Sequence, residues 1–181
     1  MKRVLVTGSQ GFIGSYVWDE LLQNGYQVVG VDNFSKYGPL TRAHDKNENF
    51  TLIQEDCASK KFMKTLENEK FDYVIAGAAM IGGISYFHKY AYDLLAMNER
   101  IISNTCDFAI EQFKNGYLKK ILVLSSSMVF ENVSTWPTKE SDLMIIIGSF
   151  TSANSKRLTE LAKQRNKHTY QVTSAEDINS D

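Results

Sequence analysis

The chain has few of the residues that mark several common classes of protein. It holds two cysteines, Cys57 and Cys106, whose separation fits neither a metal-binding pattern nor a disulfide framework. Its three histidines, His44, His88 and His168, are scattered along the sequence, so no metal site is expected. The formal net charge is −1, and no basic stripe is interleaved with aromatic residues, which argues against nucleic acid as the main partner.

Long apolar runs are also missing, so no segment reaches the length that crosses a membrane. Positive residues precede the apolar run at residues 4–6, as in a signal peptide, but the run is short and Gly8 interrupts it. We therefore expect a cytoplasmic protein with no membrane partner. A length of 181 residues fits one domain with a substantial core. We place this domain at residues 1–173 and expect the polar segment 174–181 to be a disordered tail.

The clearest pattern in the sequence lies at residues 3–14. The apolar run 4–6 predicts a buried strand, Gly8, Gly11 and Gly14 follow it, and apolar residues then recur every four positions, as in a helix. A strand, a glycine turn and a helix start together form a cradle for a pyrophosphate, because the first N–H groups of a helix lack partners. Taken alone, the three glycines also fit an ordinary strand–helix turn.

Strands alternate with helices along the rest of the chain. The apolar runs predict further strands near residues 27–31, 50–54, 72–76, 120–124 and 169–173, helices over 58–69, 92–115 and 153–166, and irregular segments at 80–90 and 131–150. This alternation predicts an α/β protein with a doubly wound parallel sheet of five or six strands, the Rossmann fold. Such a sheet binds its ligand at the carboxyl ends of the strands.

Two acidic residues follow strands of this predicted sheet. Asp32 ends the second strand, 18 residues after Gly14, where a carboxylate meets a ribose of a dinucleotide. Such a carboxylate repels a 2′-phosphate, so NAD is favoured over NADP. Asp56 ends the third strand and could reach an adenine edge. A solvated loop aspartate is the alternative in each case.

Hydroxyl groups follow the fifth strand, at Ser125, Ser126 and Ser127. A hydroxyl at this edge of the sheet could bind a substrate oxygen, although three serines after a strand also form an ordinary turn. Asn98 lies on the apolar stripe of the helix predicted at 92–115, where a polar side chain needs a partner. Asn98 is therefore interpreted either as a buried structural amide or as an active-site residue.

These residues resemble the extended short-chain dehydrogenase/reductases, specifically the NAD-dependent epimerase/dehydratases that act on nucleotide sugars. The resemblance covers roughly residues 3–142 and rests on the segments 7–14, 31–35, 76–79 and 125–130, together with Asn98. It implies that NAD takes a hydride from a sugar carbon, that the resulting keto sugar is epimerised or dehydrated, and that the hydride returns. It also implies a tyrosine base with a lysine four residues later, which lowers the pKa of the tyrosine.

The resemblance assigns roles to particular residues of this chain. It implies catalytic roles for Ser126, with Ser127 as the alternative, for Asn98, and for Lys156, which would also hold the ribose next to the nicotinamide. It implies that the cofactor is bound by a larger set: Gly8, Gly11, Phe12, Ile13, Gly14, Asp32, Asn33, Asp56, Cys57, Ala78, Ala79 and Lys156.

The sequence departs from the family pattern in two places. The residue four positions before Lys156 is Ser152, and no tyrosine in the chain has a lysine four residues later. A serine hydroxyl does not become a base near neutral pH without a strong partner. The prolines expected before this helix are replaced by the apolar run 143–147. Relatives also continue well beyond the length of this chain, so we expect the C-terminal substrate lobe to be largely missing.

Three functions remain open on this basis. The chain is an NAD-bound isomerase or oxidoreductase that acts on a nucleotide sugar, a catalytically inactive or truncated NAD-binding module, or an interaction subunit that dimerises with a full-length partner. Because the helices matching 92–115 and 153–166 often form a dimer bundle in the family, a homodimer is also expected. The identity of the sugar and of the reaction subtype cannot be inferred from these residues.

Overall fold

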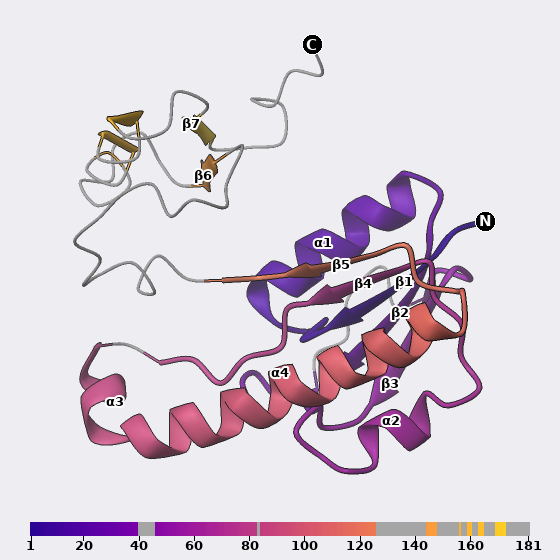
Figure 1. Ribbon diagram of the computed structural model, residues 1–181, viewed down its shortest axis with the longest axis horizontal. Coiled ribbons are helices and arrows are strands. Elements are labelled where there is room, and N and C mark those ends of the chain that lie inside the picture. Colours follow the sequence, from indigo (N-terminus) through magenta and orange to yellow (C-terminus); the bar gives the residue numbers. More distant parts are fainter. Residues whose placement is uncertain are drawn as a thin grey trace. The chain divides into compact units, whose positions relative to one another are not determined.

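The computed structural model describes residues 1–39, 46–82, 84–125, 144–147, 156, 159–160, 163–164 and 169–172 (Figure 1). The chain divides into two compact units, Met1–Ser125 and Ser126–Asp181. Each unit is described by itself below. The expected single domain over 1–173 stays a prediction, and the expected tail 174–181 lies outside the described residues.

The first unit is built on a parallel five-stranded sheet with the order β3-β2-β1-β4-β5. Its strands are β1 (Arg3–Thr7), β2 (Gln27–Asp32), β3 (Phe50–Gln54), β4 (Tyr73–Ala76) and β5 (Lys120–Val123). The strand order reverses between β1 and β4, which makes this sheet doubly wound. The predicted fold class is therefore confirmed.

Helices cover both faces of this sheet because the side chains of its central strands alternate between two cores. On one face Val4 and Val6 pack with Trp18 of α1 (Phe12–Gln23). On the other face Leu5 packs with Phe108 of α4 (Ala91–Lys114) and with the segment around α2 (Phe62–Thr65). Figure 1 shows α1 on one side of the sheet and α4 with α2 on the other.

The long helix α4 agrees with the prediction over 92–115, but its apolar stripe is narrower than expected. Its buried residues are Leu94, Thr105, Phe108, Ala109 and Gln112. By contrast, Leu95, Ile102 and Phe113, which helical spacing also places on the apolar stripe of the sequence, are 61%, 38% and 68% exposed. The sheet covers one side of a helix, so a stripe this wide cannot be buried by the sheet alone.

Two predicted elements on this side of the sheet are wrong. The helix expected over 58–69 is a single turn, α2. The N–H groups of Ser59, Phe62 and Leu66 bond carbonyls three residues back, and such bonds wind the chain more tightly than an α-helix does. The irregular segment expected at 80–90 contains the helix α3 (Ile84–Lys89). Gly82 lies before this helix and does not interrupt it.

The second unit contains a two-stranded parallel sheet. Its strand β6 (Met144–Ile147) pairs with β7 (Thr169–Val172), from Met144 opposite Thr169 to Ile147 opposite Val172. The expectation that 131–150 is irregular is therefore wrong for β6, whose isoleucines favour a strand. The strand predicted at 169–173 exists, but it pairs with β6 and not in the five-stranded sheet. The described residues between 156 and 163 are helical, as expected.

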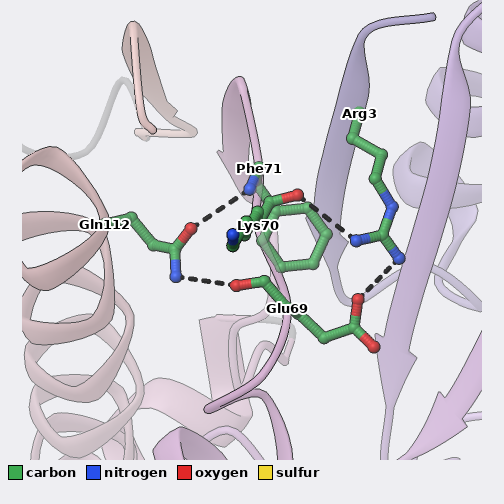
Figure 2. Close-up of polar contacts among 5 residues, drawn as sticks. All are labelled: Arg3, Glu69, Lys70, Phe71 and Gln112. Atoms are coloured by element: carbon green, nitrogen blue, oxygen red, sulfur yellow. Dashed lines mark hydrogen bonds and ion pairs between the residues drawn. The ribbon is translucent and has the colours of Figure 1, made fainter. Parts of the chain in front are cut away.

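The buried side chain of Gln112 in α4 forms hydrogen bonds with the main chain just before β4 (Figure 2). The Gln112 amide accepts a hydrogen bond from the Phe71 N–H at 3.1 Å and donates one to the Glu69 carbonyl at 2.9 Å. Arg3 of β1 donates to the Lys70 carbonyl at 3.3 Å and forms an ion pair with Glu69 at 2.6 Å. These contacts align the amino-terminal edge of the sheet, opposite the edge where ligands bind in such folds.

Candidate cofactor-binding site

The glycine turn between β1 and α1 is packed so closely that larger residues do not fit. Gly8 has φ of +70°, and a Cβ there would lie 2.8 Å from the Cα of Ala78. A Cβ on Gly14 would overlap the Gly8 carbonyl oxygen. The turn therefore brings the start of α1 against both β1 and the segment after β4, as a phosphate cradle requires.

The first turn of α1 carries no acidic residue, and the Asp32 carboxylate lies just before it, on the Gln10 N–H. Among the described residues, a Cβ on Gly11 would meet the Gly8 carbonyl oxygen at 3.1 Å and no other non-neighbouring atom within 4 Å. The helix has no side-chain cap and no acidic residue in its first turn, and Phe12 and Ile13 are exposed. Its first N–H groups can therefore receive an anion, which fits a pyrophosphate.

The segment after β4 is tied to the same turn. The Thr7 hydroxyl, which is fully buried, accepts hydrogen bonds from the N–H groups of Gly77 and Ala78 at 3.1 and 3.2 Å. Ala78 is half-buried and Ala79 is exposed. The predicted cofactor residues Gly8, Ala78 and Ala79 are thus brought together at the carboxyl ends of β1 and β4.

Asp32 is held in place by main-chain groups on both of its carboxylate oxygens. One oxygen accepts from the Gln10 N–H at 2.9 Å, and the other accepts from the Phe34 N–H at 2.7 Å. Phe34 has φ of 57°, which a phenylalanine rarely adopts, so this turn is a strained one. A carboxylate has about four acceptor positions, so Asp32 can still accept hydrogen bonds from ribose hydroxyls. Asn33 lies beside it and is exposed.

Three carboxylates gather where β2 and β3 end. Burial, together with the nearby charges of Asp56, Asp32 and Glu55, raises the pKa of the Cys57 thiol to about 12. Asp56 accepts a hydrogen bond from the Ala58 N–H at 2.8 Å, which closes a turn. Because the Cys57 side chain is buried in the core, a cofactor contact of this residue would involve its main chain.

Asn98 of α4 binds the segment after β4 with both ends of its amide. It accepts from the Met80 N–H at 2.7 Å and donates to the Met80 carbonyl at 2.9 Å. Both ends of the amide are therefore engaged by the main chain. This geometry favours the interpretation of Asn98 as a half-buried structural amide that holds the segment after β4 in place.

The remaining predicted catalytic residues are not part of this description. Ser126, Ser127 and Ser152 lie outside the described residues. Lys156 is helical and exposed, and it belongs to the second unit. Ser125, the last residue of the first unit, is exposed after β5.

Sequence reasoning missed two residues at this edge of the sheet. Asn104 of α4 donates to the Cys57 and Ser59 carbonyls at 2.8 and 3.2 Å, and Lys36 donates to the Ile81 carbonyl at 3.4 Å. The signal for Asn104 was a second asparagine six positions after Asn98 on the same helix. No comparable pattern marks Lys36, because its partner lies 45 residues away.

Among the described residues, no group of three or more histidine, cysteine or acidic side chains could hold a metal ion. The helices in that part of the chain include none that is both long and apolar enough to cross a membrane.

Comparisons with known proteins point to one family. Residues 4–174 match the model of the NAD dependent epimerase/dehydratase family. UDP-glucuronate 4-epimerase of Thermodesulfobacterium geofontis is 31% identical over 179 residues, which are 94% of this chain and 53% of that protein. The chain spans about half the length of the curated relatives that it matches along most of its own length.

Solved structures show the same fold. The UDP-Glc/GlcNAc 4-epimerase of Campylobacter jejuni has a TM-score of 0.63 at 19% identity, with 94% of this chain and 52% of that chain covered. The UDP-glucose 4-epimerase of Bifidobacterium longum, solved in complex with NAD+ and UDP, has a TM-score of 0.60 at 23% identity, with 77% and 41% covered. At these identities the likeness establishes the architecture.

Proposed function

The chain belongs to the NAD-dependent epimerase/dehydratase family, and from this membership we propose that it binds NAD in the glycine cradle and acts on a nucleotide sugar through a transient keto intermediate. The observation that carries the proposal is the open start of α1. Its first turn has no side-chain cap and no acidic residue, and among the described residues a Cβ on Gly11 would meet only the Gly8 carbonyl oxygen besides its chain neighbours. A dinucleotide pyrophosphate matches these donors in charge and geometry.

The adenosine half of NAD would lie against the carboxylates at the ends of β2 and β3. Asp32 would accept hydrogen bonds from ribose hydroxyls, with Asn33 beside it, and Asp56 would approach the adenine. A third carboxylate, Glu55, lies at the same corner. A 2′-phosphate would add two negative charges next to these groups, so NAD is favoured over NADP.

When bound, NAD supplies a hydride acceptor for a sugar carbon. By position in the family motif, Ser126, or Ser127 in its place, would donate a hydrogen bond to the reacting sugar oxygen. Lys156 would hold the ribose next to the nicotinamide. Asn98 would keep the residues after β4 in position through the Met80 main chain.

A second candidate function is NAD binding without turnover. The observation that favours it is Ser152, which occupies the position of the tyrosine base four residues before Lys156. Since a serine hydroxyl is a far weaker acid than a phenol, this position cannot supply an anionic base near neutral pH. In this case the chain still binds NAD but has no base for the proton transfer. The Ser152→Tyr variant should then form a keto sugar in the presence of NAD, whereas the wild-type chain should not.

A homodimer through α4 is the partner that we propose for the chain itself. Tyr92, Leu95, Ile102, Ile110 and Phe113 are all at least 38% exposed. At about 100° per residue these five side chains fall within about 80° of one another, on a face distinct from the one that packs on the sheet. Ile102→Glu should shift the chain to a monomer in light scattering. If the wild-type chain is a dimer and Ile102→Glu has the same mass as the wild type, this interface is wrong.

The cradle itself is tested by titrating the full chain with NAD and NADP while the melting temperature is followed. A ligand at a hundred times its Kd stabilises the folded state by about 2.7 kcal/mol. Gly11→Ala should weaken NAD binding, because its methyl group occupies the approach of the pyrophosphate while the backbone φ of −69° accepts alanine. The control Gly25→Ala lies at the far end of α1 with φ of +77° and should lower stability without changing NAD affinity. Absence of a shift with NAD would refute the proposed function.

A further inference from the structure

Three amide side chains of α4 bind main-chain groups of three distant segments. Asn98 binds Met80 after β4, Asn104 binds Cys57 and Ser59 after β3, and Gln112 binds Glu69 and Phe71 before β4. The sequence separations of these bonds run from 18 to 47 residues. The helix therefore sets the positions of several loops relative to one another.

The Asn104 contact lies on the segment that carries Asp56. The Asn104 amide nitrogen donates to the Cys57 carbonyl at 2.8 Å and to the Ser59 carbonyl at 3.2 Å. Inside this segment the Ser59 N–H bonds the Asp56 carbonyl at 2.8 Å, and the Ala58 N–H bonds the Asp56 carboxylate at 2.8 Å. Asp56 thus belongs to a closed turn, and the two carbonyls that Asn104 holds belong to the same turn.

The position of this turn determines where the Asp56 carboxylate points. The Cys57 side chain is buried in the core and holds the turn there, while the Asn104 side chain of α4 binds the main-chain carbonyl of Cys57. Loss of the two amide bonds leaves the Cys57 side chain and the Phe62 N–H bond to the Ser59 carbonyl in place, but it removes the link between this turn and α4, so that the turn can shift. Because Asp56 bonds Ser59 and Ala58 directly, its carboxylate would move with them.

We propose that Asn104 is a positioning residue for adenine recognition, and that it acts by fixing the turn that carries Asp56. This proposal rests on the proposed function, because it requires the adenosine half of NAD to lie at this corner. Asn104 does not touch the cofactor. It sets the affinity of the adenosine half and leaves that of the nicotinamide half unchanged.

The test compares two halves of the cofactor on the full, isotope-labelled chain by NMR titration, at a temperature where every variant is folded. AMP represents the adenosine half and nicotinamide mononucleotide represents the other half. Asn104→Leu keeps the side-chain size but removes both donor groups, and Asn104→Ala is the second variant if the leucine variant fails to fold. Gln112→Met is the control, because it breaks the same kind of contact at the opposite edge of the sheet.

We expect Asn104→Leu to raise the Kd of AMP and of NAD by about three- to tenfold, the range that the loss of one ordinary hydrogen bond produces. The Kd of nicotinamide mononucleotide should stay within twofold of wild type, and Gln112→Met should leave all three affinities unchanged. Equal loss of both fragments, unchanged AMP affinity, or an equal effect of Gln112→Met would each overturn the proposal. A wild-type chain that binds neither NAD nor AMP would instead refute the proposed function on which it rests.

Discussion

Gln112 is the side chain whose loss should most clearly expose how α4 holds the sheet. It is 4% exposed, and its amide both accepts from the Phe71 N–H and donates to the Glu69 carbonyl (Figure 2). We consider Gln112→Met, because methionine has a similar length and flexibility but offers no strong hydrogen bond. The substitution therefore removes two hydrogen bonds and leaves little cavity.

The magnitude follows from the burial of the two main-chain partners. Phe71 is 1% exposed, so its N–H would lose its partner away from water, which costs about 1–3 kcal/mol. Glu69 is half-buried, so water can replace the bond to its carbonyl in part, and the loss there is about 0.5–1.5 kcal/mol. We expect a total of about 2–4 kcal/mol. For a chain of this size that lowers the melting temperature by about 4–16 °C.

The assay is urea unfolding at 25 °C followed by circular dichroism, with a thermal melt beside it. The matched control is Gln23→Met, the same change on the exposed end of α1, where Gln23 makes a hydrogen bond to Asp19 at 3.2 Å in solvent. Surface bonds of this kind contribute little, so the control should stay within about 0.5 kcal/mol of wild type. A Gln112→Met variant as stable as this control would refute the reasoning.

Two further predictions concern thiol reactivity and acid stability. In the folded protein at pH 8, a thiol reagent should label Cys106 and should reach Cys57 only on unfolding. The reason is that Cys57 is buried and its pKa is raised to about 12. Rapid reaction of both thiols in the folded protein would contradict this prediction. The hydrogen bonds from the Lys119 side chain and the Arg3 main-chain N–H lower the pKa of Asp72 below its ordinary value of 3.8. The ionised Asp72 therefore stabilises the folded state above pH 3.8, and this stabilisation is lost as the pH falls through the lowered pKa of the folded state. Asp72→Asn should therefore be less stable than wild type at pH 7, and the gap should narrow in urea unfolding at pH 3, because the unfolded carboxyl is then largely protonated. An equal gap at both pH values would be inconsistent with this linkage.

The parts of the fold that could be predicted from sequence are those with local signals. The spacing of Gly8, Gly11 and Gly14 predicts the turn, in which Gly8 adopts a positive φ and Gly14 packs against the Gly8 carbonyl, and Asp32 follows from its distance to that turn. The end of α1 at Gly25 was likewise predictable, because a left-handed cap requires a residue without a side chain. These features depend on residues that are neighbours in the chain.

The parts that were not predicted depend on distant partners. Asn98 was recognised as a polar residue on an apolar stripe, yet its partner is a main chain 18 residues away, which no pattern reveals. The residues flanking α2 have helical periodicity, but bonds of Phe62 and Leu66 to carbonyls three residues back limit the helix to one turn. Pairing of β6 with β7 spans 25 residues from Met144 to Thr169, and of these two strands the sequence predicted β7 but neither β6 nor the pairing.

The environment of Trp18 gives this protein an internal optical reporter. Its indole is fully buried, stacks on Phe50 at 4.2 Å between ring centroids, and donates to the Ser9 carbonyl of the glycine turn at 2.9 Å. Indole emission is sensitive to polarity and to hydrogen bonding, so a displacement of the Ser9 carbonyl changes the fluorescence of Trp18 directly. The chain has one other tryptophan, Trp136, so a Trp136→Phe variant would emit from Trp18 alone. The glycine turn can then be followed in real time without any attached dye.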